Sequence, residues 1–267
     1  MKKRGEDANN RKGQITIFII LAIVVVVLGI VLYFFYPKII SNFGFESNPS
    51  LYMESCIKED LTNTVEKISS QGGSLEPEHY IMYQGNKIEY LCYTEEYYTT
   101  CIMQQPMLKQ HIEKEVQEAI KSKVSECFDL LKEDYEKKGY SVNLKKGEIS
   151  IELLPQRIIA LFNSTLTIKK EESQKYDSIK IVLNNNLYEL VSIANSILNW
   201  EARYGDSETT TYMDYYHDLK VEKKKQSEGS TIYILTDRTS ENKFQFASRS
   251  VAWPPGYGID KVYIENA

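Results

Sequence analysis

The feature that most constrains this chain is an uncharged apolar run near its N-terminus. Residues 14–37 contain no charged side chain and read QITIFIILAIVVVVLGIVLYFFYP. As a helix, residues 14–36 would be about 34 Å long, which is enough to cross a bilayer core of about 30 Å. An apolar run of this length without charged residues is unusual in a small soluble domain. The sequence therefore predicts a transmembrane helix over residues 14–36.

The charges that flank this run predict its orientation. Residues 1–13 carry five basic and two acidic side chains, whereas Lys38 alone follows the run closely. By the positive-inside rule, the basic flank stays in the cytoplasm. We therefore expect a cytoplasmic leader over residues 1–13, a single pass through the cell membrane and an extracellular C-terminal domain. The lipid bilayer is the first expected partner.

The overall charge excludes one class of partner. The whole chain has a net charge of −5, so the residues after the basic leader sum to −8. A nucleic-acid-binding domain would instead show a basic patch or stripe. We expect no nucleic acid partner.

The junction between the leader and the apolar run carries a resemblance to a known family. Arg11-Lys12-Gly13-Gln14, followed by the apolar run, resembles the class III signal peptide of archaeal type IV pilin and archaellin precursors. The resemblance implies that a prepilin-type peptidase cuts between Gly13 and Gln14 on the cytoplasmic side. It also implies other surface or pilus proteins as partners. The alternative is that the leader is not cleaved and the apolar run serves as a plain membrane anchor.

The resemblance of the whole chain to a wider group of proteins does not imply any particular activity. The whole chain is similar to uncharacterised surface proteins of small-genome archaea that share a KGQITIF-type start. Many pilins and archaellins place a Glu early in the mature segment, but Phe18 is the fifth mature residue here and the next Glu is Glu46. Pro37 and Pro49 also interrupt the helical pattern, so residues 37–49 are predicted to be a tether. Both departures weigh against a polymerising subunit.

Residues 50–139 are predicted to form a helical subdomain. Apolar side chains recur every three or four positions over residues 50–71 and 106–139, which indicates two amphipathic helices. Glycines follow both patterns, and two short strands, over residues 79–83 and 87–93, lie between them. The predicted buried stripes are Ile57, Leu61, Val65 and Ile68, then Leu108, Ile112, Val116, Ile120, Val124, Cys127 or Phe128, Leu131 and Tyr135.

Residues 140–267 are predicted to form an α+β subdomain, because the apolar period changes towards two. A helix is expected over residues 184–203 and a shorter one over 212–219. The expected strands cover residues 142–144, 149–153, 159–168, 179–183, 220–225, 231–237 and 243–249. The predicted fold class is therefore an α+β ectodomain on a single N-terminal transmembrane helix, with a helix-rich first half and an antiparallel-sheet-rich second half.

The four cysteines predict two disulfides. An even set outside the membrane is in an oxidising setting, where disulfides are the default, and four cysteines allow three connectivities. Two antiparallel helices would bring Cys56 close to Cys127, while Cys92 and Cys101 flank a Tyr-rich excursion. We therefore favour Cys56–Cys127 with Cys92–Cys101. The sequence has no C-x₂-C pair of soft ligands, so no metal site is predicted.

The sequence points to no catalytic centre and no cofactor. His79, His111 and His217 are scattered, and no G-x-S-x-G, H-E-x-x-H or P-loop string is present. We interpret His111 as a solvated side chain and His217 as part of an acidic and aromatic surface segment. We expect none of the three to join a nucleophile and an orienting group, although catalytic partners can meet from anywhere in a chain.

The composition leaves the function open between three hypotheses. Twenty Tyr fit either a binding surface or a strand-rich fold. The sequon Asn163-Ser164-Thr165 predicts a glycan on Asn163. The first hypothesis is a non-enzymatic membrane-anchored surface protein, either a pilin-like subunit or an accessory attachment factor. The alternative is a solitary receptor or adhesin that does not polymerise. An anchored extracellular hydrolase is third, since it would need a concave pocket with convergent titratable groups.

Overall fold

The computed structural model describes residues 21–27 and 48–252, and the structural statements below concern these residues. Residues 21–27 form a short helix, and the described residues from Pro49 onward belong to a separate unit. The predicted leader, the predicted cleavage bond between Gly13 and Gln14, and most of the predicted tether lie outside the described residues.

The predicted fold class is wrong for the described residues. No helix in the described ranges combines the length and the apolar character needed to cross a membrane. Of the segment predicted to span the membrane, only residues 21–27 are described. The three long helices, Pro49–Ser70, Leu108–Lys137 and Leu187–Tyr204, each bury one apolar stripe and expose polar or charged side chains on their other faces. The folded part is a mixed α/β domain in which strands from both halves of the chain share one sheet.

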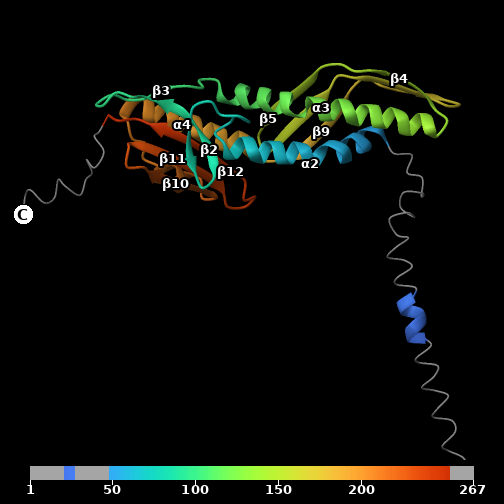
Figure 1. The fold of residues 1–267 in the computed structure, drawn as a ribbon, viewed down its shortest axis with the longest axis horizontal. Helices are drawn as coiled ribbons and strands as arrows, with labels where there is room; N and C mark the ends of the chain where they lie inside the picture. Colours follow the sequence, from blue (N-terminus) through green and yellow to red (C-terminus); the bar gives the residue numbers. More distant parts are fainter. Residues whose placement is uncertain (1–20, 28–47, 253–267) are drawn as a thin grey trace, which may run out of the picture. The chain divides into compact units, whose positions relative to one another are not determined.

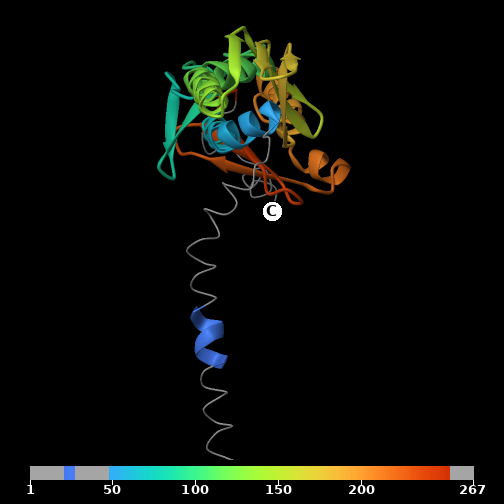
Figure 2. The ribbon, with the colours of Figure 1, turned by 90° about the vertical axis from the view of Figure 1, so that its right-hand side faces the viewer.

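Two long helices form one side of the domain. The helices α2 (Pro49–Ser70) and α3 (Leu108–Lys137) run side by side in opposite directions (Figures 1 and 2). All the residues of the two predicted apolar stripes are buried, so this prediction is confirmed. At the end of α2, Gly72 has a φ of +91°, and a Cβ on this residue would lie 2.8 Å from the Cβ of Glu89. Only glycine lets the chain turn so close to the neighbouring strand.

The largest sheet combines strands from the first and last parts of the chain. Its order is β1-β2-β12-β11-β10, with β3 paired to β2, and all its pairs are antiparallel except the parallel pair β2–β12. The helix α4 (Leu187–Tyr204) packs against β12 and β11, and α5 (Thr210–Tyr215) packs against β10. The strands are β1 (Tyr80–Tyr83), β2 (Asn86–Tyr93), β3 (Ile102–Met103), β10 (Leu219–Lys225), β11 (Ser230–Asp237) and β12 (Lys243–Arg249).

Two three-stranded antiparallel sheets complete the domain, in the orders β4-β7-β8 and β5-β6-β9. The predicted single strand over residues 159–168 is in fact two strands, because the chain leaves one sheet for the other at Asn163 and Ser164. The strands are β4 (Ser141–Lys145), β5 (Ile149–Leu154), β6 (Arg157–Phe162), β7 (Thr165–Lys169), β8 (Ser173–Tyr176) and β9 (Ile179–Asn184).

The main core draws on both halves of the chain. It runs from Met53 in α2 to Phe246 in β12 and includes buried residues of α2, α3, α4 and all three sheets. The predicted ranges 50–139 and 140–267 therefore share one core. A second, smaller cluster, formed by Ile88, Tyr90, Ile232 and Ala247, lies on the six-stranded sheet.

Candidate binding surface

The two predicted disulfides are present in the structure. Cys56 of α2 is bonded to Cys127 of α3 with a Cα–Cα distance of 6.0 Å, and Cys92 is bonded to Cys101 with a Cα–Cα distance of 5.3 Å. No free cysteine is found in the described part of the chain. The first bond ties the two long helices together. The second closes a short loop beside the six-stranded sheet.

This short loop, residues 94–100, is called the tyrosine loop below, and it is held in place at several points. The Thr94 N–H donates to the carbonyl of Arg249 (3.0 Å), and the Tyr98 N–H donates to the carbonyl of Val251 (2.8 Å). The Cys101 N–H donates to Ser250 Oγ (3.1 Å). These bonds and the Cys92–Cys101 disulfide fix the loop before any partner arrives, which lowers the entropy cost of binding.

Aromatic rings form a continuous strip that ends at the tyrosine loop. The His79 ring lies 4.8 Å from the Tyr90 ring and 4.2 Å from the Tyr93 ring, centroid to centroid. The Arg249 guanidinium carbon lies 5.8 Å from the Tyr93 centroid and 6.0 Å from the Tyr97 centroid, so the cation links the two rings. We call these five residues the aromatic strip. Tyr97 at its end is 57% exposed.

The strip continues the smaller apolar cluster rather than the main core. Tyr90 belongs to that cluster. Four partly buried strand residues pack against the cluster: Ile81, Tyr83, Tyr93 and Ile234. The Tyr90 hydroxyl pairs with Ser230 Oγ (2.8 Å), and burial raises its pKa. An exposed aromatic side chain on a pinned loop, with an arginine beside it, is typical of protein binding surfaces.

A half-buried polar cluster around the buried Ser74 joins α3 to β2. Ser74 Oγ donates to Glu89 Oε2 (2.5 Å) and lies 2.7 Å from His111 Nε2. Nearby, the Leu75 N–H donates to Glu115 Oε2 (2.8 Å). Burial lowers the pKa of His111, although the Glu115 charge opposes this, and burial also raises the pKa of Glu89. The interpretation of His111 as a solvated side chain is therefore wrong.

The order of this cluster differs from that of a hydrolytic triad. In a triad the carboxylate bonds to the histidine and the histidine bonds to the serine. Here the Glu89 carboxylate accepts a hydrogen bond from Ser74 itself, and no bond between Glu89 and His111 is found among the described residues. Ser74 is also buried, so a substrate could not reach its hydroxyl without a rearrangement. The geometry makes Ser74 a bridge between the end of α2, β2 and α3.

We expect His111 to contribute a loss of stability to the domain in mild acid. The folded state holds the pKa of His111 below its unfolded value of about 6.5, so the unfolded chain binds the additional proton as the pH falls. Glu89 acts in the opposite sense, since its raised pKa adds stability at low pH that is lost as the pH rises through that pKa. Urea unfolding between about pH 8 and pH 5 measures the summed effect of these groups on the free energy of unfolding.

The variant His111→Gln isolates the contribution of His111. It keeps a hydrogen-bonding side chain beside Ser74 but cannot titrate, so it should lose less stability than the wild-type chain over this range. His217→Gln, at an exposed position, is the matched control. Parallel pH profiles for the wild-type chain and His111→Gln would contradict the prediction.

A second buried polar cluster surrounds Glu201 of α4. The Tyr233 hydroxyl and the Ser207 N–H (2.9 Å) both donate to Glu201 Oε1, and Ser248 Oγ donates to Oε2 (3.2 Å). Glu201 is 2% exposed. Burial raises its pKa, and burial also raises the pKa of Tyr233. Cys101 Sγ lies 3.6 Å from Ser248 Oγ, so the cluster lies directly behind the tyrosine loop.

The remaining sequence predictions have separate places in the fold. The structure gives the three histidines different partners: His79 belongs to the aromatic strip, His111 contacts Ser74, and the exposed His217 accepts a bond from Arg238 at its carbonyl (3.5 Å). Asn163 is exposed in the connection between β6 and β7, and its glycan stays a prediction. In the described ranges, no group of three or more His, Cys, Asp or Glu is placed to hold a metal ion.

The two polar clusters were not predicted from the sequence. The available signal for Glu201 was a carboxylate on the apolar stripe of a predicted helix, four positions after Ile197. Ser74, Glu89 and His111 show no such signal, because they come from a turn, a strand and a helix.

Comparisons with protein-family models, curated proteins and solved structures found no match for the chain.

Proposed function

We propose that this chain is a non-enzymatic cell-surface protein whose folded domain works outside the cytoplasm as a binding domain for attachment. The observation that carries the proposal is the aromatic strip, which ends at the exposed Tyr97 on the pinned tyrosine loop. Tyrosine offers a large amphipathic contact area at a low entropy cost, and arginine and tyrosine are enriched among the residues that dominate binding energy. An accessory attachment factor or a solitary adhesin both fit this reading.

The disulfides support the location. Two bonds that use all four cysteines of the sequence would be unusual in a reducing cytoplasm and are common in surface proteins. The proposal can be tested with a membrane-impermeant biotin reagent on intact cells that produce the full chain. We expect labelling of the exposed lysines of the domain without lysis. Labelling only after lysis would contradict the proposed location.

The order of the Ser74 cluster supports a non-enzymatic role over the hydrolase. Its serine is buried and its carboxylate does not orient the histidine. The first test of a candidate nucleophile is whether its hydrogen bonds to a base, and the base's bonds to an orienting group, have the order that the reaction needs.

Replacing Tyr97 and Tyr98 by Ala should abolish most attachment. Both rings are exposed, so their loss removes contact area for a partner without opening the core, and the expected decrease in binding is about tenfold or more. The measurement compares the attachment of cells that produce the wild-type chain or the variant to neighbouring cells and to surfaces.

Tyr215→Ala is the matched control for this test, because Tyr215 is 81% exposed and lies on α5. It should leave attachment unchanged. Biotin labelling of intact cells checks that all variants reach the surface in equal amounts. An equal loss of attachment in Tyr215→Ala, or no difference between producing and non-producing cells, would reject the proposal.

A further inference from the structure

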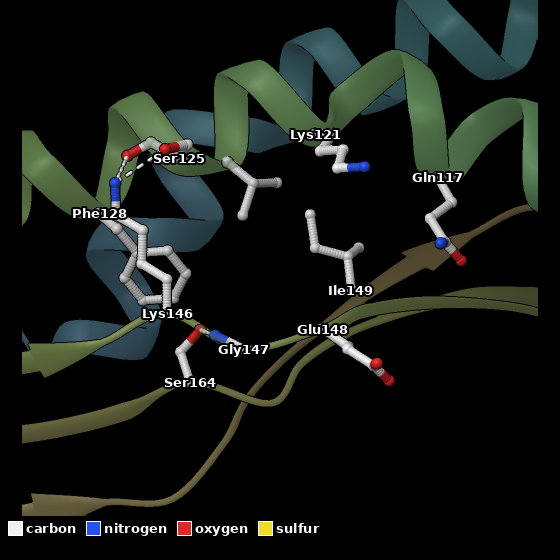
Figure 3. A pocket seen from close by; sticks show the side chains of 10 residues that line it. Gln117, Lys121, Ser125, Phe128, Lys146, Gly147, Glu148, Ile149 and Ser164 are labelled. Atoms are coloured by element: carbon white, nitrogen blue, oxygen red, sulfur yellow. Dashed lines mark hydrogen bonds between the residues drawn. The ribbon is translucent and has the colours of Figure 1, made fainter.

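The cavity beside α3 does not select a ligand. It has a volume of about 590 Å³ and lies between α3 and the connection from β4 to β5 (Figure 3). Lys146 at one end donates to Ser125 and to the Asp129 carboxylate, so its ammonium group has no proton left for a ligand. Figure 3 shows the Glu148 side chain pointing away from α3, so Lys146 and Glu148 do not converge on a ligand. In contrast, the free edge of the six-stranded sheet presents a defined row of backbone groups.

The strand β1 forms this edge, and its sequence lacks the usual protection of an edge strand. Natural edge strands commonly carry charged residues, especially lysine, or proline. The opposite edge of the sheet, β10, follows this rule, since it carries four lysines and packs against α5. The strand β1 reads YIMY, and in the described part of the chain it pairs with β2 alone. Figure 2 shows its hairpin with β2, in teal, at the margin of the domain.

The hydrogen bonds of the hairpin show which groups of β1 face outward. The Tyr90 N–H donates to the carbonyl of His79 (2.9 Å), so these two residues form a hydrogen-bonded pair. Hydrogen-bonded and non-hydrogen-bonded pairs alternate along an antiparallel ladder, which makes Ile81 the next hydrogen-bonded residue of β1. The N–H and C=O groups of Tyr80 and Met82 therefore point away from β2. The described residues supply no partner for these four groups.

The side chains of β1 are uncharged on both faces. Tyr80 and Met82 share one face and are 37% and 58% exposed. Ile81 and Tyr83 lie on the other face, partly buried against the smaller apolar cluster. An incoming strand therefore meets an uncharged edge with four free backbone groups and two exposed side chains.

We propose that β1 pairs with β1 of a second copy of this chain, in antiparallel register about a two-fold axis at Ile81. Tyr80 then lies opposite Met82 of the second copy, and Met82 lies opposite Tyr80 of the second copy. The outward N–H and C=O groups of these residues match reciprocally, so all four groups of each copy gain a partner. Two-fold pairs are the commonest symmetric assemblies.

The side chains favour a second copy in this register over an unrelated strand. Each Tyr80 ring faces a Met82 thioether, and contacts between sulfur and aromatic rings are favourable. The two Ile81 side chains meet on the other face and extend the smaller apolar cluster of both copies. A shift by one residue would place the free groups of one copy against groups of the other that already bond to β2. No like charges oppose each other, because β1 carries none.

The edge is short, so the pairing is weak. Four strand residues per copy bury much less surface than the roughly 1,200–2,000 Å² of a stable complex. Sedimentation of the purified full chain should therefore show a concentration-dependent dimer, with a Kd on the order of 100 μM. This pairing does not depend on the attachment role of the aromatic strip.

An introduced cysteine tests the register. The two Ile81 residues form a non-hydrogen-bonded pair with Cα atoms about 4.5 Å apart, within the range that a disulfide spans. Ile81→Cys should therefore form a disulfide-linked dimer in a glutathione buffer. Its yield should be at least about tenfold above that of Met82→Cys, whose two copies lie too far apart along the strands for a disulfide.

Ser173→Cys is the matched control for this experiment, because Ser173 is exposed on the edge strand β8. It should give no more dimer than Met82→Cys. Non-reducing electrophoresis measures the dimer, and peptide mapping checks that the two native disulfides are unchanged.

Met82→Lys supplies the protection that the edge lacks. The added ammonium group lies across from Lys87 of β2 and leaves no apolar side chain to face Tyr80 of the second copy. It should weaken the association at least about tenfold. Tyr215→Lys, at an exposed position of α5, is the matched control and should dimerise like the wild-type chain. Thermal unfolding checks that both variants remain folded.

Three results would overturn the proposal. A wild-type chain that stays monomeric up to about 1 mM, without excess cross-linking of Ile81→Cys, would leave the edge for a strand of a different protein. A dimer that survives Met82→Lys would place the contact on another surface. Cross-linking through Met82→Cys in preference to Ile81→Cys would contradict the two-fold axis at Ile81.

Discussion

Removing the Cys56–Cys127 disulfide is expected to lower the free energy of unfolding by about 4 kcal/mol. The bond joins residues 71 positions apart, so in the chain-entropy model it restricts a large part of the unfolded ensemble. The variant Cys56→Ala/Cys127→Ala and urea unfolding measure this loss. The Cys92–Cys101 bond closes a separation of only 9 residues, and its removal should cost less, about 2.5 kcal/mol.

Reduction of the wild-type chain provides a second measurement that leaves the side chains in place. Cys127 is buried, so its replacement by Ala also changes the packing between α2 and α3. Reduced wild-type protein keeps this packing but lacks both disulfides, so its expected loss is the sum of the two, about 6.5 kcal/mol. Agreement between this loss and the summed losses of the two Cys→Ala variants would assign the losses to the covalent bonds. Free thiols at all four positions in the oxidised protein would contradict the disulfide framework.

The long amphipathic helices and the disulfides were predictable because both depend on local patterns. The apolar stripe of α3 repeats at helical spacing, and every member of the predicted stripe is buried. Once α2 and α3 are placed antiparallel, Cys56 and Cys127 fall at neighbouring ends. The predicted fold class failed because it gave the apolar run the role of a spanning helix, and no such helix occurs in the described ranges.

The sheet pairings could not be derived from sequence, because they join distant segments. The parallel pair β2–β12 connects Tyr90 to Ala247, and a strand pattern alone does not choose its partner. The strand β8 was missed because its sequence, SQKY, is polar, and its pairing with β7 alone places it in the sheet. The break at Asn163 was hidden because residues 159–168 read as one continuous strand.

The aromatic strip shows how local and distant information combine at the candidate site. The excess of tyrosine and the excursion between Cys92 and Cys101 were visible in the sequence. The placement of Arg249 beside Tyr93 and Tyr97 depends on the pairing of β12 with β2. The packing of α4 on β12 brings Ser248 to Glu201, so the support behind the tyrosine loop also depends on contacts that no local pattern contains.

Replacing Glu201 by Ala is expected to destabilise the domain by about 3–5 kcal/mol. The change leaves the Tyr233 hydroxyl, the Ser207 N–H and the Ser248 hydroxyl buried without their acceptor, and each loss is expensive away from water. Glu201→Gln keeps an acceptor oxygen and a similar shape, so it should cost about 1 kcal/mol or less near neutral pH. Urea unfolding of both variants gives the comparison.

The pH dependence of the same variants tests whether burial controls this carboxyl group. Burial raises the pKa of Glu201 above its unfolded value, so the group adds stability that is present in acid and is lost as the pH rises through the folded pKa. Glu201→Gln cannot ionise and should lose less stability than the wild-type chain over that rise. Tyr233→Phe removes one donor to the carboxylate and is the companion variant, with an expected cost of about 1–2 kcal/mol. If Glu201→Ala and Glu201→Gln unfolded at the same urea concentration, the hydrogen bonds to Glu201 would not be what joins α4 to the six-stranded sheet.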